Sequence, residues 1–534
     1  MSDSVKKQNF LHGAALLALA TAVVKVIGAL YKIPLKMVIG DQGYGYFMTA
    51  YNIYAVLLMI STAGLPVAMS RMISQASSLG HYRQVRRVYS TARGIFLGLG
   101  IVSSGLMVLF CHQLAAFQKQ PDAWAAILSL GPCALLMGII STYRGFFQGQ
   151  GNMRPTSVSQ VLEAVCKLAV GLAAAFAIMY YTKSVALAAG GAILGVTVSC
   201  LISAVYLKGK LRPAYKELPQ SNEQVQSWGA TAKGLLVIAV PITIGSAGLQ
   251  LLTVLETNLY MGQLLTANGL SQDTADTMKG IYDMSQTIFN MPCSFIVPIA
   301  ISVIPAITSQ LTLQNHQAVR ETEESAARVT GLISLPCSVG LCLLARPIMA
   351  LLGGYSGEKL DLAAQLMGIL GVSVFLYAII QYTNSLMQAH GYAHVPVINM
   401  LLAGVMKLVA VYVLVGNPAI GILGAPVGAV LCYLCIAVLN LIAIRKFVAQ
   451  KPALLKNLLR PFLPAVIMGV AVYGCYWLLV QLLGAEGSRV VLCGVPILAG
   501  VAVYGVSVVV LKAITREDCQ LLPKGDKLAK LLHL

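Results

Sequence analysis

Three lysines follow one face of the first long apolar segment and its immediate continuation. Lys25, Lys32 and Lys36 are spaced seven and four residues apart, so in an α-helix they fall within about 40° of one another. A lysine at the centre of a membrane-spanning helix costs about 2.5–3.5 kcal/mol on insertion scales, so this cationic face indicates a polar cavity or a bound anion. The alternative is that Lys32 and Lys36 reach the outer interface on their flexible stems and that only Lys25 is buried.

Polar side chains also follow three further apolar segments, a pattern that marks a water-filled cavity or an interhelical contact. Arg71, at the inner end of the second segment, fits a topology anchor as well as a ligand. Together these segments predict a substrate cavity that is positive on one side and polar on the other. The further candidate substrate-binding residues are Tyr51, Asn52 and Arg71 in the second segment, Gln250 in the seventh, and Gln286 and Asn290 in the eighth.

Two carboxylates lie inside apolar segments. Glu256 has no cation three or four residues away on its own helix, which makes it the candidate carboxylate for coupling to a proton or a cation. Glu163 and Lys167 are spaced i,i+4 in the fifth segment, where they can meet on one helix face. For these two we expect a structural ion pair.

The composition identifies the kind of chain that must position these residues. The 534 residues are 57% hydrophobic and only 10% charged, against about 25% charged for a soluble domain. The sequence therefore predicts an all-α polytopic membrane protein. Its net charge of +18 fits cytoplasmic loops that face anionic lipid rather than a nucleic-acid partner.

Polar intervals divide the chain into fourteen segments of about the 20 residues that a bilayer requires. With the N-terminus inside, cytoplasmic intervals hold 26 of the 37 lysines and arginines, against 8 in external intervals. This excess predicts that both termini are cytoplasmic. The segments lie near 11–33, 46–70, 90–112, 124–147, 157–180, 184–207, 233–262, 280–310, 325–345, 362–388, 395–415, 421–444, 461–482 and 488–512.

An internal duplication organises these segments. At a constant offset of 240 residues, six positions are identical, and they include Gln148 and Gln388, and Lys167 and Lys407. The repeat predicts an N-lobe at 1–208, a cytoplasmic linker at 209–232 and a C-lobe at 233–446, with the substrate site between two parallel six-helix lobes. Two extra helices and a basic amphipathic tail follow at 447–534.

The sequence also lacks the motifs of several catalytic classes. It contains no G-x-x-x-x-G-K-[ST] and no H-E-x-x-H, and its twelve cysteines form no cluster with metal-ligand spacing. We therefore expect no cofactor, no metal site and no enzyme activity. A membrane-bound glycosyltransferase or acyltransferase is the alternative from another class, but it would need a catalytic loop larger than the longest one here, of about 25 residues.

The segment RGFFQGQGNMRPTSVSQVLEAVCK at 144–167 resembles the RG-x-x-QG…P-T-x-x-S-Q-x-x-E signature of the stage V sporulation protein B group. The segment at 25–74 is similar to the same group, which includes Gram-positive lipid II flippases and shares a superfamily with polysaccharide exporters and multidrug and toxin extrusion transporters. The resemblance implies two six-helix lobes plus two extra helices, alternating access, and an undecaprenyl-pyrophosphate-linked saccharide as substrate at the plasma membrane.

The resemblance also assigns roles to particular residues. It places basic cavity residues at Lys25, Lys32 and Arg71, and Asp41 corresponds to the family's Asp after the first segment. Glu256 and Asn399 match part of a sodium site of some lipid II flippases, which also has an Asp on the eleventh segment. In this chain Lys407 occupies the later part of that segment, and no carboxylate appears there. Either a proton or sodium therefore remains open as the coupling ion. A multidrug exporter of the same fold is the alternative function, and its cationic substrates would favour an acidic cavity.

Overall fold

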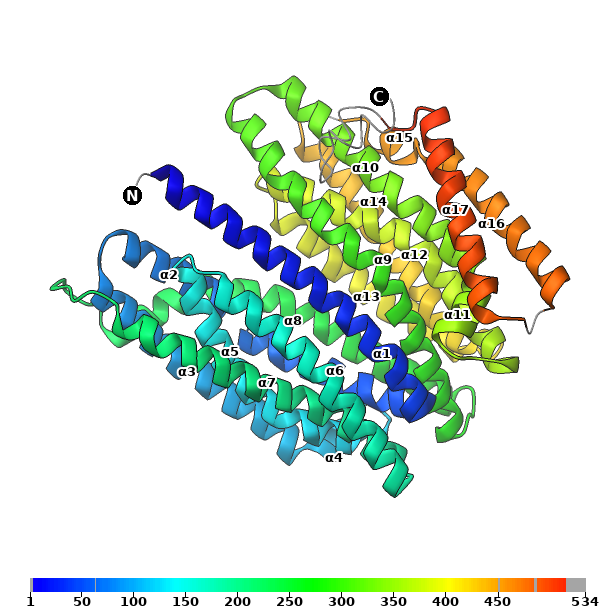
Figure 1. Ribbon diagram of the computed structural model, residues 1–534, viewed down its shortest axis with the longest axis horizontal. Helices are drawn as coiled ribbons and strands as arrows, with labels where there is room; N and C mark the ends of the chain where they lie inside the picture. The colour runs from blue at the N-terminus through cyan, green and yellow to red at the C-terminus, as the bar shows by residue number, and fades with distance from the viewer. Residues whose placement is uncertain (1–2, 63, 450–451, 485–486, 515–534) are drawn as a thin grey trace. The chain divides into compact units, whose positions relative to one another are not determined.

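The computed structural model describes residues 3–62, 64–449, 452–484 and 487–514. Within these ranges the chain forms helices and no strands (Figure 1). Some further side chains inside α1, including that of Lys25, lie outside the described residues. The all-α class predicted from the sequence is confirmed.

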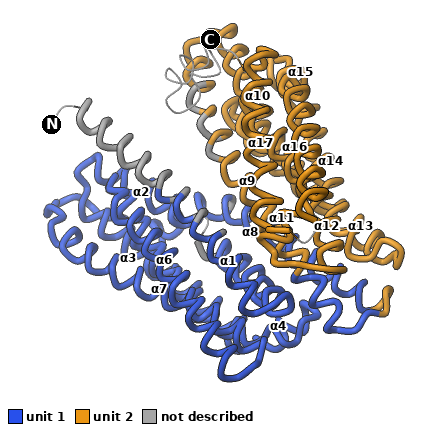
Figure 2. Tube along the Cα trace, turned by 45° about the vertical axis from the view of Figure 1, so that its right-hand side comes forward, with its two compact units in different colours: residues 1–265, 270–280 blue, residues 266–269, 281–534 orange. Residues whose placement is uncertain are grey.

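The chain divides into two compact units (Figure 2). Unit 1 holds residues 1–265 and 270–280, and unit 2 holds residues 266–269 and 281–534. The helices α1–α8 belong essentially to unit 1: α1 (Asp3–Thr62), α2 (Leu65–Ser78), α3 (Tyr82–Leu109), α4 (Cys111–Phe117), η1 (Pro121–Ala123), α5 (Trp124–Gly149), α6 (Arg154–Thr182), α7 (Val185–Lys216) and α8 (Trp228–Thr266).

The first turns of α9 (Gln272–Thr312) belong to unit 1 and the remainder of that helix belongs to unit 2. Within unit 1, α7 packs against α5 and α6, and α3 packs against α5. The other helices of unit 2 are α10 (His316–Leu343), α11 (Ala345–Leu352), α12 (Gly357–Ala389), α13 (His394–Gly416), η2 (Gly421–Leu423), α14 (Gly424–Phe447), α15 (Leu454–Leu459), α16 (Phe462–Leu483) and α17 (Arg489–Val510).

Two helix-ending turns at the duplication offset have the same hydrogen bonds. After α5, Gly151 has φ +75° and Asn152 N donates to Phe147 O at 2.9 Å. After α12, Gly391 has φ +85° and Tyr392 N donates to Met387 O at 2.8 Å. A glycine with positive φ closes a helix in this way because it has no Cβ to clash. Each residue of the first turn is 240 positions from the equivalent residue of the second, which is the offset of the repeat.

Among the described residues, twelve helical runs are long and apolar enough to cross a membrane. The predicted fourteen differ from this at two places. Residues 30–78 count as one run, because α1 joins two helices across a kink at Gly40, where φ and ψ are not helical. The helix α9 is not among the twelve, and its first turns carry Asp273, Asp276, Lys279 and Asp283. The count of fourteen stays a prediction.

The C-terminal helices α15 and α17 contact α10 within unit 2. Arg328 Nη1 on α10 donates to Asn457 Oδ1 on α15 at 3.0 Å, and Tyr504 Oη on α17 donates to Leu332 O at 2.7 Å. A Cβ added to Gly331 would lie 2.2 Å from Leu458 O, so α10 and α15 approach closely because this position lacks a side chain. The additional helices are therefore fixed to α10.

The segment between α7 and α8 is fastened to the start of α3. Glu223 Oε1 accepts from Gln84 N at 2.9 Å, and Ser221 Oγ accepts from Arg83 N at 3.1 Å. Arg86 Nη2 donates to Leu218 O at 2.8 Å. The first two bonds satisfy backbone N–H groups at the N-terminus of α3 that have no partner within the helix. We call residues 217–227 the strap.

Candidate functional site

The lysine face of α1 lies beside a bend in that helix. Gly40 has φ +69° and ψ −174°, and Pro34 lies one and a half turns before it. Lys36 Nζ contacts Asp41 Oδ1 at 3.2 Å, and both side chains are buried. The bend thus brings two predicted substrate-binding residues of opposite charge together, and each lowers the cost of burying the other.

A second polar network joins α1 to the first turns of α9 inside unit 1. Asp276 is fully buried and accepts from Tyr46 Oη at 3.0 Å, Gln120 Nε2 at 2.9 Å and Gln272 Nε2 at 3.0 Å. Lys279, also fully buried, donates to Gly45 O at 3.1 Å. This network is not predicted from the sequence, because residues 269–279 lie between the segments predicted at 233–262 and 280–310. The four charges at 273–283, spaced three or four residues apart, were the available signal.

Close backbone approach makes that network possible. A Cβ added to Gly280 would lie 1.9 Å from Asp41 O, and one added to Gly45 would lie 3.4 Å from Asp276 O. Two glycines therefore allow α9 to contact α1 directly at the bend. Asp41, the residue that pairs with Lys36, sits at this contact.

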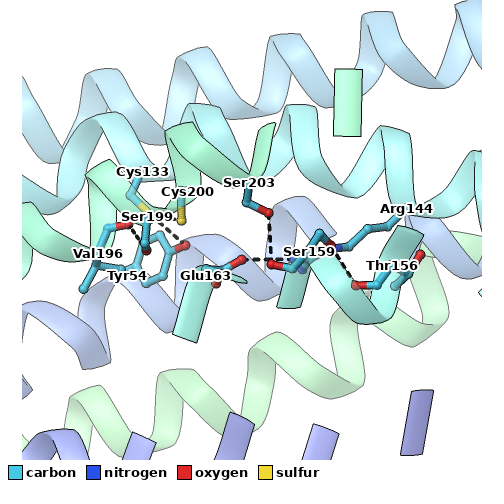
Figure 3. Close-up of polar contacts among 10 residues, drawn as sticks. All are labelled: Tyr54, Cys133, Arg144, Thr156, Ser159, Glu163, Val196, Ser199, Cys200 and Ser203. Carbon is cyan, nitrogen blue, oxygen red and sulfur yellow. Dashed lines mark hydrogen bonds and ion pairs between the residues drawn. The ribbon is translucent and has the colours of Figure 1, made fainter. Parts of the chain in front are cut away.

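Arg144 and Glu163 form an ion pair in the interior of unit 1 (Figure 3). Arg144 Nη2 donates to Glu163 Oε2 at 3.0 Å, and Arg144 Nε donates to Ser159 Oγ at 3.0 Å. Ser159 Oγ in turn donates to Thr156 O at 2.7 Å. The guanidinium is thereby held between a carboxylate and a hydroxyl, which suits its planar set of donors.

Lys167 is not the ion-pair partner of Glu163 that the i,i+4 spacing predicts, and this expectation is wrong. Arg144, brought from α5 by the turn at Gly151, holds the carboxylate instead. The Lys167 ammonium lies over the Tyr31 ring, 5.8 Å from its centroid. Such a cation–π contact contributes about 0.5–2 kcal/mol, less than the about 2.5–3.5 kcal/mol cost of a lysine at a helix centre.

A thiol cluster lies farther along the same helices. Cys133 on α5 and Cys200 on α7 are buried with their sulfur atoms 3.3 Å apart, and Tyr54 Oη lies 3.3 Å from Cys133 Sγ (Figure 3). Small, polarizable thiols pack here as they do in other helix interiors.

The remaining predicted site residues fall in both units, and the structure brings only Lys36 and Asp41 together by a described contact. In unit 1, Glu256 is buried, Arg71 is exposed, and Lys32, Tyr51, Asn52 and Gln250 are half-buried. In unit 2, Gln286 is half-buried and Asn290 is exposed. The Lys25 side chain lies outside the described residues.

Asn399 belongs to an amide network in unit 2. Its Nδ2 donates to Asn440 Oδ1 at 2.9 Å, while Asn440 Nδ2 donates to Thr383 Oγ1 at 3.0 Å and to Asn384 Oδ1 at 2.9 Å. Glu256, its predicted partner in ion coupling, lies in unit 1. These hydrogen bonds join neutral groups, and they tie α13 to α14 and α14 to α12.

Comparison with known proteins identifies the family. The model of the polysaccharide biosynthesis protein family matches residues 10–311, more than half of the chain. The chain belongs to this family. A second model, MatE, matches residues 280–413. Together with the apolar helices, this makes the chain a multi-pass membrane protein.

The alignments with three curated relatives from Bacillus subtilis (strain 168) cover most or nearly all of each relative's length. The chain is 26% identical to the uncharacterized membrane protein YabM, with 100% of this chain and 99% of the relative covered. It is 24% identical to stage V sporulation protein B, with 97% and 98% covered. It is also 24% identical to lipid II flippase MurJ, with 88% and 89% covered. The resemblance to the sporulation protein and flippase group is thus confirmed.

Solved structures show the same fold. A lipid II flippase MurJ in an inward closed conformation superposes with a TM-score of 0.67 at 12% identity and covers 93% of this chain and 99% of that one. An inward-facing multidrug resistance MATE transporter superposes with a TM-score of 0.65 at 16% identity, with 82% and 95% covered. Identities this low support the fold alone.

Proposed function

We propose that this polysaccharide biosynthesis family member is a flippase of the plasma membrane with cytoplasmic termini. It moves undecaprenyl-pyrophosphate-linked peptidoglycan or polysaccharide precursors across the bilayer by alternating access. The observation that carries this proposal is the set of cations inside apolar helices of unit 1, Lys32 and Lys36 on α1 and Lys167 on α6. A pyrophosphate requires cations, whereas the undecaprenyl chain can remain in lipid.

The proposed binding step is an exchange of partners at the α1 bend. Lys36 and Asp41 neutralise each other at 3.2 Å, and the incoming pyrophosphate competes with Asp41 for the ammonium. Such an exchange couples the substrate to the state of the helix, because a ligand shifts a conformational equilibrium only through different contacts in the two states. The substrate-binding residues of this proposal are Lys25, Lys32, Lys36, Asp41, Tyr51, Asn52, Arg71, Gln250, Gln286 and Asn290, with Glu256 and Asn399 for a coupling proton or sodium ion.

Complementation tests this proposal in cells. A bacterial strain that depends on an inducible lipid II flippase should survive depletion when it expresses this chain, and Lys25→Ala should remove that rescue at normal protein abundance. Lys25→Arg should retain part of it, because the charge persists while the geometry changes. Full rescue by Lys25→Ala would contradict an anion-binding role for the α1 lysines.

The multidrug exporter is the second candidate, supported by the MatE match at residues 280–413. It predicts energy-dependent export of a cationic dye such as ethidium and no effect on lipid-linked precursors. The lysine face of α1 repels such substrates, so we favour the flippase. Dye export without rescue of the depleted strain would reverse this choice.

A further inference from the structure

Lys167 is a cation inside unit 1 whose carboxylate neighbour is held elsewhere. It lies at the middle of α6, is half-buried, and makes its cation–π contact with Tyr31 at 5.8 Å. No ion pair to Lys167 occurs in the part of the chain that the structure describes. The described contact of the Lys167 ammonium is therefore with a ring that carries no formal charge.

Tyr31 is a rigid support for this ammonium. Its hydroxyl donates to Ala192 O on α7 at 3.0 Å, and a Cβ added to Gly171 would lie 2.6 Å from that hydroxyl. The side chain is fully buried between α6 and α7. Tyr31 immediately precedes Lys32 in the chain, so the Lys167 ammonium contacts the helix that carries the α1 lysines.

Arg144, and not Lys167, makes the ion pair with Glu163. Its guanidinium holds Glu163 at 3.0 Å and Ser159 at 3.0 Å, and two fixed contacts of this kind favour arginine over a flexible lysine. The three side chains together carry a net charge of +1.

The internal repeat separates the lysine from the ion pair. At the offset of 240 residues, Lys407 corresponds to Lys167, whereas Asn384 and Ala403 correspond to Arg144 and Glu163. The arginine and the carboxylate are present together in the first half and absent together in the second. The lysine occurs in both halves, so it does not depend on the pair.

We propose that Lys167 is an anion-binding residue of unit 1 that takes the phosphate or pyrophosphate group of the substrate, and that Arg144 is a positioning residue that keeps Glu163 away from it. This inference rests on the proposed function, which supplies a lipid-linked pyrophosphate as the ligand. It adds a site on α6 to the candidates on α1. The ligand binds the lysine through a charge-assisted hydrogen bond, and no covalent bond is formed or broken.

Binding to the full-length protein in nanodiscs tests the inference. The probes are undecaprenyl pyrophosphate, undecaprenol as the neutral lipid, and inorganic pyrophosphate as the soluble anion. Lys167→Gln should weaken undecaprenyl pyrophosphate binding by about tenfold or more, the loss expected for one charge-assisted contact. Lys183→Gln, at the exposed end of the same helix, is the matched control and should bind as the wild type does.

The decisive variants leave Lys167 in place. Arg144→Gln releases Glu163 to pair with Lys167 at i,i+4 and should weaken binding about as much as Lys167→Gln does. The double variant Arg144→Gln/Glu163→Gln removes the competing carboxylate and should restore most of the affinity. A merely structural role for Arg144 predicts that the melting temperature falls and recovers together with the affinity, whereas the inference predicts that the affinity changes in samples of equal melting temperature. These two proteins also keep the test valid if Lys167→Gln does not fold, which size-exclusion profiles and melting temperatures report.

Each outcome has a defined meaning. Wild-type affinity in Lys167→Gln, or failure of the double variant to recover, overturns the inference and leaves the proposed function standing. Binding of inorganic pyrophosphate with equal affinity and equal dependence on Lys167 supports the site but contradicts a lipid-linked substrate. If wild-type protein binds neither anion, both the inference and the proposed function are wrong.

Discussion

At the scale of single residues, the buried pair of Lys36 and Asp41 has a measurable cost when it is broken. Asp41→Asn removes the carboxylate 3.2 Å from the Lys36 ammonium, and loss of one member of a buried pair typically costs about 3–5 kcal/mol. Lys36→Met/Asp41→Leu removes both charges and should recover most of that stability. Melting temperatures in detergent measure both effects.

An exposed ion pair supplies the control. Arg346 and Asp361 contact each other in unit 2 with side chains 52% and 53% exposed, so Asp361→Asn should change stability by less than about 1 kcal/mol. A wild-type melting temperature for Asp41→Asn would show that burial at the α1 bend carries no such penalty.

The sequence identified buried charges better than it identified their partners. Lys36, Glu163 and Lys167 were recognisable because charges inside apolar segments are costly. The partner of Glu163 was not, since Arg144 is 19 residues away on another helix and reaches it only once the hairpin of α5 and α6 has formed. Local spacing favours i,i+4 pairs and contains no information about a third residue that competes for the same carboxylate.

At the scale of elements, the contact between the strap at 217–227 and the start of α3 should depend on pH. Desolvation by itself raises the pKa of Glu223. Hydrogen bonds from the Ser221 hydroxyl and from backbone amides, including those of Gln84 and Arg83, outweigh it and lower this pKa from its ordinary value of 4.5 to about 2. A carboxylate with a lowered pKa stabilises the folded contact above its ordinary pKa and loses that contribution as the pH falls through its folded pKa.

The strap should therefore stay fastened at pH 6 and loosen between about pH 4.5 and pH 2. Hydrogen exchange of the Arg83 and Gln84 amides, corrected for intrinsic rates, measures this directly. Glu223→Gln should show weakened protection already at pH 6, while the neighbouring exposed Glu217→Gln should not. Equal protection in Glu223→Gln and wild type at pH 6 would mean that the carboxylate does not fasten the strap.

Helix ends were predictable where the signal is local. The turn at Gly151 and its repeat at Gly391 have the positive φ that glycine permits, and the sequence placed breaks at both. The predicted interval between the first two segments, at 34–45, contains Gly40, whose non-helical φ and ψ join the two helices that make up α1. Contacts that support the bend come from Gly280 and Asp276, which are 230 or more residues away along the chain.

At the scale of the whole molecule, the distribution of lysine and arginine predicts the topology. The 26-to-8 excess places both termini in the cytoplasm. In a chain whose twelve native cysteines are replaced, single cysteines at the exposed positions Ser271 and Ser356 should react with an impermeant maleimide added to intact cells. Cysteines at Ser78 and Asn222 should react only after permeabilisation. The reverse pattern would reject cytoplasmic termini.

The central claim is that this chain moves a lipid-linked pyrophosphate across a bilayer. The most direct test reconstitutes the full-length protein into vesicles that contain fluorescent undecaprenyl-pyrophosphate-linked saccharide in both leaflets and follows quenching by an impermeant reductant. We predict that quenching reaches the inner-leaflet pool with wild-type protein, and that it stops at the outer-leaflet pool in protein-free vesicles and with Lys167→Gln. Quenching that stops at the outer-leaflet pool with folded wild-type protein, under either a proton or a sodium gradient, would contradict the account.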